Sequence, residues 1–176
     1  MNTKNIIIMA AILIGLGVSS RLLPHPANVV PIGAIALFAG LYMPRRIAIV
    51  ATLLPMLLSD MIIGFYHWQM MISVYGCFAI SIYIGSLIKQ KTLQNVVGAT
   101  LAGSIIFFGV TNAAVWAFGS MYAKTFTGLM ESHTMALPFF RNSLIGDLFF
   151  VGILVGSMEA IKSFQANQLK SSTKSV

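Results

Sequence analysis

The sequence has little charge, few acidic residues and a single cysteine. Only 9% of its 176 residues are charged, whereas 57% are hydrophobic. The mean hydropathy is +0.87, and too few polar residues remain to cover the surface of a soluble domain of this length. This composition excludes a soluble domain and predicts an integral membrane protein.

These scarcities also exclude several kinds of chemistry. Because Cys77 is the one cysteine, the chain has no disulfide and no CxxC metal or redox pair. No Gly-Lys dipeptide occurs, so there is no GxxxxGK[ST] loop for ATP phosphates, and any energy from ATP must come from another subunit. The net charge of +7 does not indicate nucleic acid as a partner, because lysines and arginines between apolar segments orient a chain in a bilayer.

Six apolar stretches predict an all-α, polytopic membrane protein, a bundle of six transmembrane helices that forms one domain over 1–176. A full span takes about 20 residues, so the second stretch would be tilted, partly re-entrant or lengthened by its flanks. The first stretch resembles a signal peptide, but no small-x-small cleavage site follows it, and we expect it to stay as a helix. The predicted helices cover about 6–20, 29–42, 47–65, 70–87, 96–118 and 144–161, with a long outer lid loop over about 119–142.

The positive charges predict the orientation. With both termini in the cytoplasm, the outer segments carry three basic residues, Arg21, Lys124 and Arg141. The inner segments then carry eight: Lys4, Arg45, Arg46, Lys89, Lys91, Lys162, Lys170 and Lys174. Since positive residues accumulate on the cytoplasmic side, we predict a multi-pass protein of the plasma (inner) membrane with the N-terminus and C-terminus inside.

Four polar or reactive residues fall at one predicted depth. From the helix rise, Asp60, Cys77, Asn112 and Asp147 lie roughly 5 to 11 Å from the outer boundary. Such side chains at membrane depth are costly unless they face a bundle interior or a wet cavity, so they favour a pocket open to the outside. The alternative is a hydrogen-bonded cluster that ties the helices together.

Cys77 is the strongest candidate for chemistry. Acting alone, it would be a nucleophile or one ligand to a metal carried by another molecule, whereas a free cysteine often serves as inert packing. A catalytic thiolate needs a nearby base such as histidine, and none of the three histidines lies within a predicted span.

Several ordered blocks carry a resemblance to a known family. The chain resembles the small bacterial membrane proteins that include the BtuM-type cobalamin transporters, which are similar to the substrate-binding (S) components of energy-coupling-factor transporters. The match runs from about Arg21 to Asp147. The blocks are RLLPHPAN (21–28), PIGAIALFAG (31–40), LSD (58–60), VYGCF (74–78), FFGVTNAAVW (107–116) and PFFRN (138–142).

The resemblance implies a six-helix component that captures vitamin B12 (cobalamin) in an outward-facing pocket, within membrane lipid. It implies a scaffold subunit and two ATPases as partners, no intrinsic cofactor, and Cys77 as the axial ligand of the cobalt. A thiolate is a strong, soft donor, so it would displace the vitamin's own nucleotide base and weaken the bond to a cyanide on the opposite face. Removal of cyanide would then be assisted by Cys77.

Other residues have predicted contacts with the corrin. Arg141 would bind corrin amide carbonyls or the vitamin's phosphate, or else anchor its helix at the interface. Asp60 and Asn112 would hydrogen-bond corrin amides, or each other. Tyr75, Phe78, Trp116, Phe139 and Phe140 would form apolar walls, or else an aromatic belt at the membrane boundary.

The alternatives from other classes are an S component for another vitamin or small molecule, a thiol-dependent membrane enzyme, and a non-catalytic assembly subunit.

Small residues recur every four positions in the first stretch, at Ala11, Gly15 and Ser19. Such a stripe lets another helix approach closely. It would serve either a partner subunit or packing within the same bundle.

Overall fold

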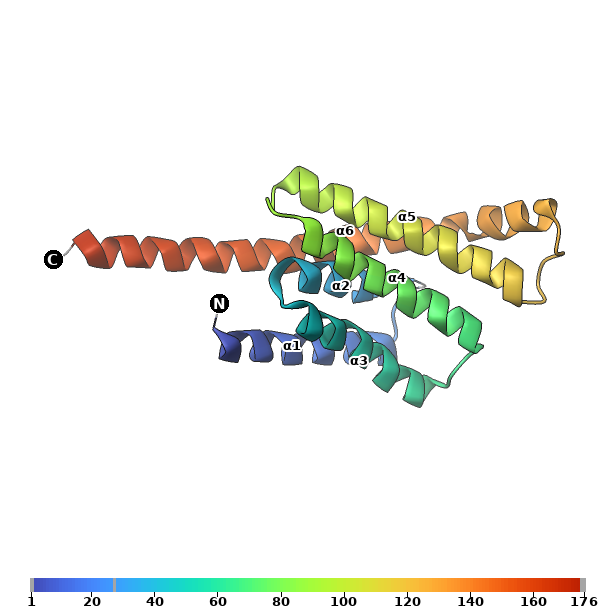
Figure 1. Cartoon of the computed structure of the whole chain (residues 1–176), viewed down its shortest axis with the longest axis horizontal. Helices are drawn as coiled ribbons and strands as arrows, with labels where there is room; N and C mark the ends of the chain where they lie inside the picture. Colours follow the sequence, from blue (N-terminus) through green and yellow to red (C-terminus); the bar gives the residue numbers. More distant parts are fainter. Residues whose placement is uncertain (1, 27, 175–176) are drawn as a thin grey trace.

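The computed structural model describes residues 2–26 and 28–174, the last six of these by their backbone alone. Within these residues the chain is all-helical and has no strand, which confirms the predicted fold class at this level. The six helices are α1 (Thr3–Leu22), α2 (Ile32–Tyr42), α3 (Arg45–Ile63), α4 (Trp68–Leu87), α5 (Leu93–Phe118) and α6 (Phe126–Lys174), arranged side by side in a bundle (Figure 1).

The described part of the chain has five helices that are long and apolar enough to cross a membrane, namely all except α2. Large apolar side chains cover the outside of the bundle. Ile12, Ile62 and Ile72 are each more than 60% exposed, and lipid is the environment that suits such a surface. The chain is therefore membrane-embedded.

α2 is the centre of the bundle and is too short to be a span. Its 11 residues rise about 17 Å, roughly half of a hydrocarbon core. Every residue from Ile32 to Leu41 is buried except Gly33, because α3, α4, α5 and α6 all pack against it. The predicted helix over 29–42 thus starts too early, and its apolar character reflects burial in protein.

α2 and α4 cross with almost no space between their backbones. A Cβ atom at Gly40 would collide with the backbone carbonyl of Ile82, and one at Gly85 would lie 2.5 Å from the carbonyl oxygen of Leu37. Small residues allow this kind of close approach between membrane helices. The crossing fixes how α4 presents its residues to the rest of the bundle.

The predicted lid loop over about 119–142 is wrong for most of its length. The connection between α5 and α6 covers only 119–125, and α6 then runs for 49 residues. The side chain of Thr125 caps its start, where the hydroxyl accepts a hydrogen bond of 3.2 Å from the amide of Gly128. α5 and α6 form a hairpin that reaches past the α3–α4 turn, and the other end of α6 extends beyond the bundle (Figure 1).

The stripe of small residues on α1 faces outward. Ala11, Gly15 and Ser19 are exposed, and a Cβ atom at Gly15 would meet no neighbour within 4 Å. α1 packs on α3 through another face, where a Cβ atom at Gly17 would lie 2.8 Å from the Cβ of Pro55. The stripe therefore takes no part in packing within the described bundle.

Candidate functional site

Two adjoining cavities lie among the helices, one of about 60 Å³ and one of about 150 Å³. The first lies between α2, α4, α5 and α6, and the second lies between α5 and α6, nearer the turn that joins them. Their common wall consists of Asn28, Ser104, Phe107, Ser143 and Asp147. We call the two cavities and this wall the α5–α6 site.

Asp147 is the charged residue of the α5–α6 site. Its Oδ2 accepts a hydrogen bond of 2.8 Å from the hydroxyl of Ser104 on α5. Its Oδ1 lies against Gly33 in the first turn of α2, so close that a Cβ atom there would collide with it. The carboxylate therefore lies where three helices meet, next to the N-terminus of α2.

The second cavity contains three of the residues predicted to contact the corrin, namely Asn112, Phe139 and Phe140. The side-chain amide of Asn112 donates a 2.8 Å hydrogen bond to the carbonyl of Phe108. Phe108 also stacks against Phe140, with 4.6 Å between the ring centroids. This cavity thus has both aromatic and polar walls, and Asn112 and Asp147 are among its polar residues.

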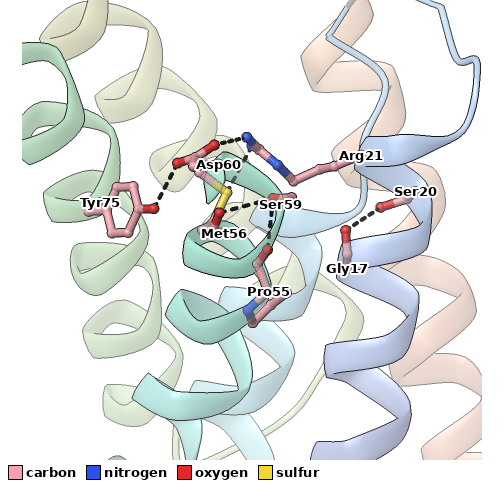
Figure 2. Close-up of polar contacts among 8 residues, drawn as sticks. All are labelled: Gly17, Ser20, Arg21, Pro55, Met56, Ser59, Asp60 and Tyr75. Atoms are coloured by element: carbon pink, nitrogen blue, oxygen red, sulfur yellow. Dashed lines mark hydrogen bonds and ion pairs between the residues drawn. The ribbon is translucent and has the colours of Figure 1, made fainter. Parts of the chain in front are cut away.

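Asp60 and Tyr75 belong to a different cluster, near the α3–α4 turn (Figure 2). The carboxylate of Asp60 forms an ion pair with Arg21 at the end of α1, and it accepts a 2.7 Å hydrogen bond from the hydroxyl of Tyr75. The guanidinium of Arg21 also contacts the sulfur of Met56 at 3.0 Å. Burial raises the pKa of Tyr66 in the nearby α3–α4 connection, and the charge of Asp60 raises it further.

The predicted corrin contact of Asp60 has a competing explanation in this geometry. The carboxylate of Asp60 is 1% exposed, and both of its oxygens have partners within the protein. It lines neither cavity of the α5–α6 site, and its partners are Arg21 and Tyr75 rather than Asn112. The contacts of Asp60 are therefore those of a hydrogen-bonded cluster that ties helices together.

Cys77 is buried, with 2% exposure, and it lines neither cavity. Its backbone carbonyl accepts a 3.1 Å hydrogen bond from Ser81. The next residue, Phe78, lines the first cavity and packs against Phe107 with 5.2 Å between ring centroids. Cys77 thus lies one residue along α4 from the wall of the α5–α6 site.

Trp116 and Arg141 lie outside both cavities. The indole N–H of Trp116 donates a 3.0 Å hydrogen bond to the carbonyl of Ala123, and the ammonium of Lys124 donates to the carbonyl of Trp116. These hydrogen bonds therefore connect Trp116 to the α5–α6 turn. Arg141 is exposed on α6.

Sequence reasoning missed most of the small polar residues at this site, including Ser104, Asn28 and Ser143. One signal was available. Thr100, Ser104, Phe107 and Thr111 follow one another at spacings of four, three and four residues, which places them on one face of a helix. All of them line one or both cavities.

Within the described residues, no group of three or more histidine, cysteine, aspartate or glutamate side chains is placed to hold a metal ion.

The comparisons with known proteins define the class of the chain without defining an activity. Residues 1–169 match the family described as "Family of unknown function (DUF6580)", and because the match covers nearly the whole chain, the protein belongs to this family. No curated protein and no solved structure matches it.

Proposed function

We propose that this protein is a membrane substrate-binding component for the uptake of cobalamin, and that the ligand enters at the α5–α6 site. The observation that carries the proposal is the pair of adjoining cavities in a membrane-embedded bundle. Ligand sites in helical bundles are concave, largely apolar and provided with a few polar groups. Asp147, Ser104 and Asn112 supply those groups here.

The proposal includes an opening of the bundle. Cavities of about 60 and 150 Å³ are far too small for a corrinoid, so the α5–α6 hairpin would move away from α2 and α4 when the ligand enters. Aromatic packing between Phe108 and Phe140 would then be exchanged for contact with the flat macrocycle.

The same opening would bring Cys77 to the ligand. Phe78 covers the neighbouring part of the cavity wall, and displacement of its ring from Phe107 would expose the sulfur beside it. A thiolate is a soft donor that binds cobalt strongly, and its formation on binding would release a proton. With cobalt bound to Cys77, loss of a cyanide from the opposite face would be assisted.

The orientation and partners of the protein belong to the same proposal. Both termini would be cytoplasmic, in the plasma (inner) membrane, so that the α5–α6 turn faces outside. The outward stripe at Ala11, Gly15 and Ser19 would offer a scaffold subunit a surface for close helix contact, and ATPases bound to that scaffold would supply energy.

Calorimetric titration of the detergent-purified protein with cyanocobalamin tests the proposal, with the wild type compared with Cys77→Ala. We expect binding by the wild type, with a changed corrin absorption band, and loss of both in the variant. Ser73→Ala is a matched control, because Ser73 lies on the same helix and, among the described residues, its hydroxyl donates a single hydrogen bond, to the carbonyl of Gln69. It should bind as the wild type does.

Two results would contradict the proposal in different ways. No binding by a folded wild-type protein would reject cobalamin as the ligand. Equal binding and an equal spectrum in the wild type and Cys77→Ala would support cobalamin as the ligand but would show that Cys77 does not bind the cobalt. Thermal unfolding of each variant would establish that the bundle is intact.

A further inference from the structure

When Asp147 is ionised, its negative charge is only partly compensated by the chain. A carboxylate within a membrane helix is costly unless a positive group or several hydrogen-bond donors satisfy it. In the described residues, the ion pairs are Arg21 with Asp60 and Lys162 with Glu159, and neither includes Asp147. Among the groups that line the two cavities, Asp147 is the one acidic residue, and no basic residue lines them.

The hydrogen bonding around Asp147 is short of one donor. The hydroxyl of Ser104 lies 2.8 Å from Oδ2 of Asp147 and 3.0 Å from the carbonyl oxygen of Thr100. A hydroxyl has a single hydrogen to donate, so these two acceptors compete for it. When the hydrogen points to Thr100, the carboxylate oxygen and the lone pairs of the Ser104 hydroxyl face each other without a positive charge between them.

The N-terminus of α2 compensates part of the charge. Its first turn has Pro31 as the cap and no side-chain cap bond, and Gly33 lets Asp147 approach it closely. The positive end of a helix dipole equals about half of an elementary charge. This partial charge attracts the carboxylate of Asp147 but does not neutralise it.

We propose that the α5–α6 site binds a small monovalent metal cation, sodium or potassium, which lies beside the carboxylate of Asp147 and the hydroxyl of Ser104 and contacts both oxygens. Hard cations prefer oxygen ligands, and a single carboxylate matches a single positive charge. The adjoining cavities of about 60 and 150 Å³ leave room for the ion and its remaining waters. This cation site shares Asp147 and Ser104 with the proposed cobalamin site, but its test needs neither cobalamin nor Cys77.

Thermal unfolding of the detergent-purified protein without any corrinoid tests this inference. Sodium chloride or potassium chloride is titrated against N-methylglucamine chloride at constant ionic strength, so that only the cation changes. We expect a saturable rise in the Tm of the wild type with at least one of the two salts, because a ligand that binds the folded state stabilises it by mass action. Asp147→Asn should lose this rise.

Two further variants test whether the effect of salt on the Tm arises at the proposed site. Ser104→Ala removes one oxygen ligand and should weaken the affinity for the cation by about 10- to 100-fold, as loss of supporting groups at metal sites does. Glu159→Gln is the matched control, because Glu159 is an exposed carboxylate on the same helix that pairs with Lys162. It should respond to salt as the wild type does.

Direct binding of radioactive sodium or potassium to the wild type and Ser104→Ala provides a second measurement, should Asp147→Asn fail to fold. No response of the wild type to either cation would overturn the proposal, and so would equal responses of the wild type and Asp147→Asn. A Tm that depends on pH but on neither salt would mean that a proton, rather than a metal cation, compensates Asp147. That result would also overturn the proposal. None of these results depends on whether cobalamin binds.

Discussion

Arg21 at the end of α1 is paired with Asp60 in α3 (Figure 2). The two residues are 39 positions apart, and the carboxylate also accepts a hydrogen bond from Tyr75 on α4. One buried side chain therefore joins three helices. Because α1 otherwise meets the bundle through small and apolar residues such as Gly17 and Leu13, this polar junction fixes the position of its end.

We predict that Arg21→Met strongly destabilises the protein. The substitution leaves the carboxylate of Asp60, which is 1% exposed, without its charged partner. Removal of one member of a buried ion pair costs about 3–5 kcal/mol. The free energy of unfolding in detergent, measured by denaturant titration, should fall by an amount of this order.

A control for this prediction is Lys162→Met, which breaks the exposed pair with Glu159. Surface pairs contribute less than about 1 kcal/mol, so this variant should unfold almost as the wild type does. Equal losses in the two variants would mean that Arg21 and Asp60 are not a buried pair.

A second prediction concerns Tyr75→Phe. The change removes the hydroxyl that donates to Asp60 at 2.7 Å and keeps the ring. An unsatisfied buried acceptor costs about 1–3 kcal/mol, so the unfolding free energy should fall by this order. Tyr83→Phe on the same helix is the matched control, because Tyr83 is 51% exposed, and it should have little effect. A loss that is as large for Tyr83→Phe would contradict the role of the Tyr75 hydroxyl.

Hydropathy predicted that the chain is a helical membrane protein but did not predict where every helix begins and ends. Apolar stretches mark burial in either lipid or protein, so α2 was expected to be a span although it is a short core helix. The first turns of α6 were expected to be a loop, because Glu131, Ser132 and His133 lower their hydropathy. They form a helix in which these polar groups find local partners, such as the carbonyl of Leu129 for both Ser132 and His133.

For the candidate site, the sequence could indicate how deep a residue lies in the membrane but not which way its side chain points. Depth follows from helix rise, so Asp60, Cys77, Asn112 and Asp147 were expected near one level. Which way a side chain points depends on how its helix is rotated, and that is set by contacts between helices such as the glycine crossing of α2 and α4. Asn112 and Asp147 line one cavity together, whereas Asp60 turns to Arg21 and Cys77 is buried beside the wall.

That crossing is the basis of a third prediction, for Gly40→Ala. Its Cβ atom would collide with the backbone carbonyl of Ile82, and backbone cannot move aside as a flexible side chain can. Overpacking of this kind costs about 1–3 kcal/mol, so the variant should have a lower Tm. Gly98→Ala in α5 is the matched control, because no atom lies within 4 Å of its Cβ position. Alanine is the better helix former by about 1 kcal/mol, so that variant should be unchanged or slightly stabilised, and a fall in Tm as large as that of Gly40→Ala would contradict the role assigned to the crossing.

The last prediction is that Cys77 reacts slowly with a water-soluble maleimide in the folded, ligand-free protein. Only 2% of the residue is exposed, so the reagent must wait for a local opening, and each tenfold decrease in rate corresponds to about 1.4 kcal/mol of opening free energy. A cysteine placed at the exposed position Lys89, as Lys89→Cys in a Cys77→Ala background, supplies the rate of an accessible thiol. We expect Cys77 to react at least about tenfold more slowly than this reference. Both should react equally after unfolding in dodecyl sulfate. Rapid reaction of Cys77 in the folded protein would mean that the sulfur already meets water, and that the opening we propose for ligand entry is not needed to reach it.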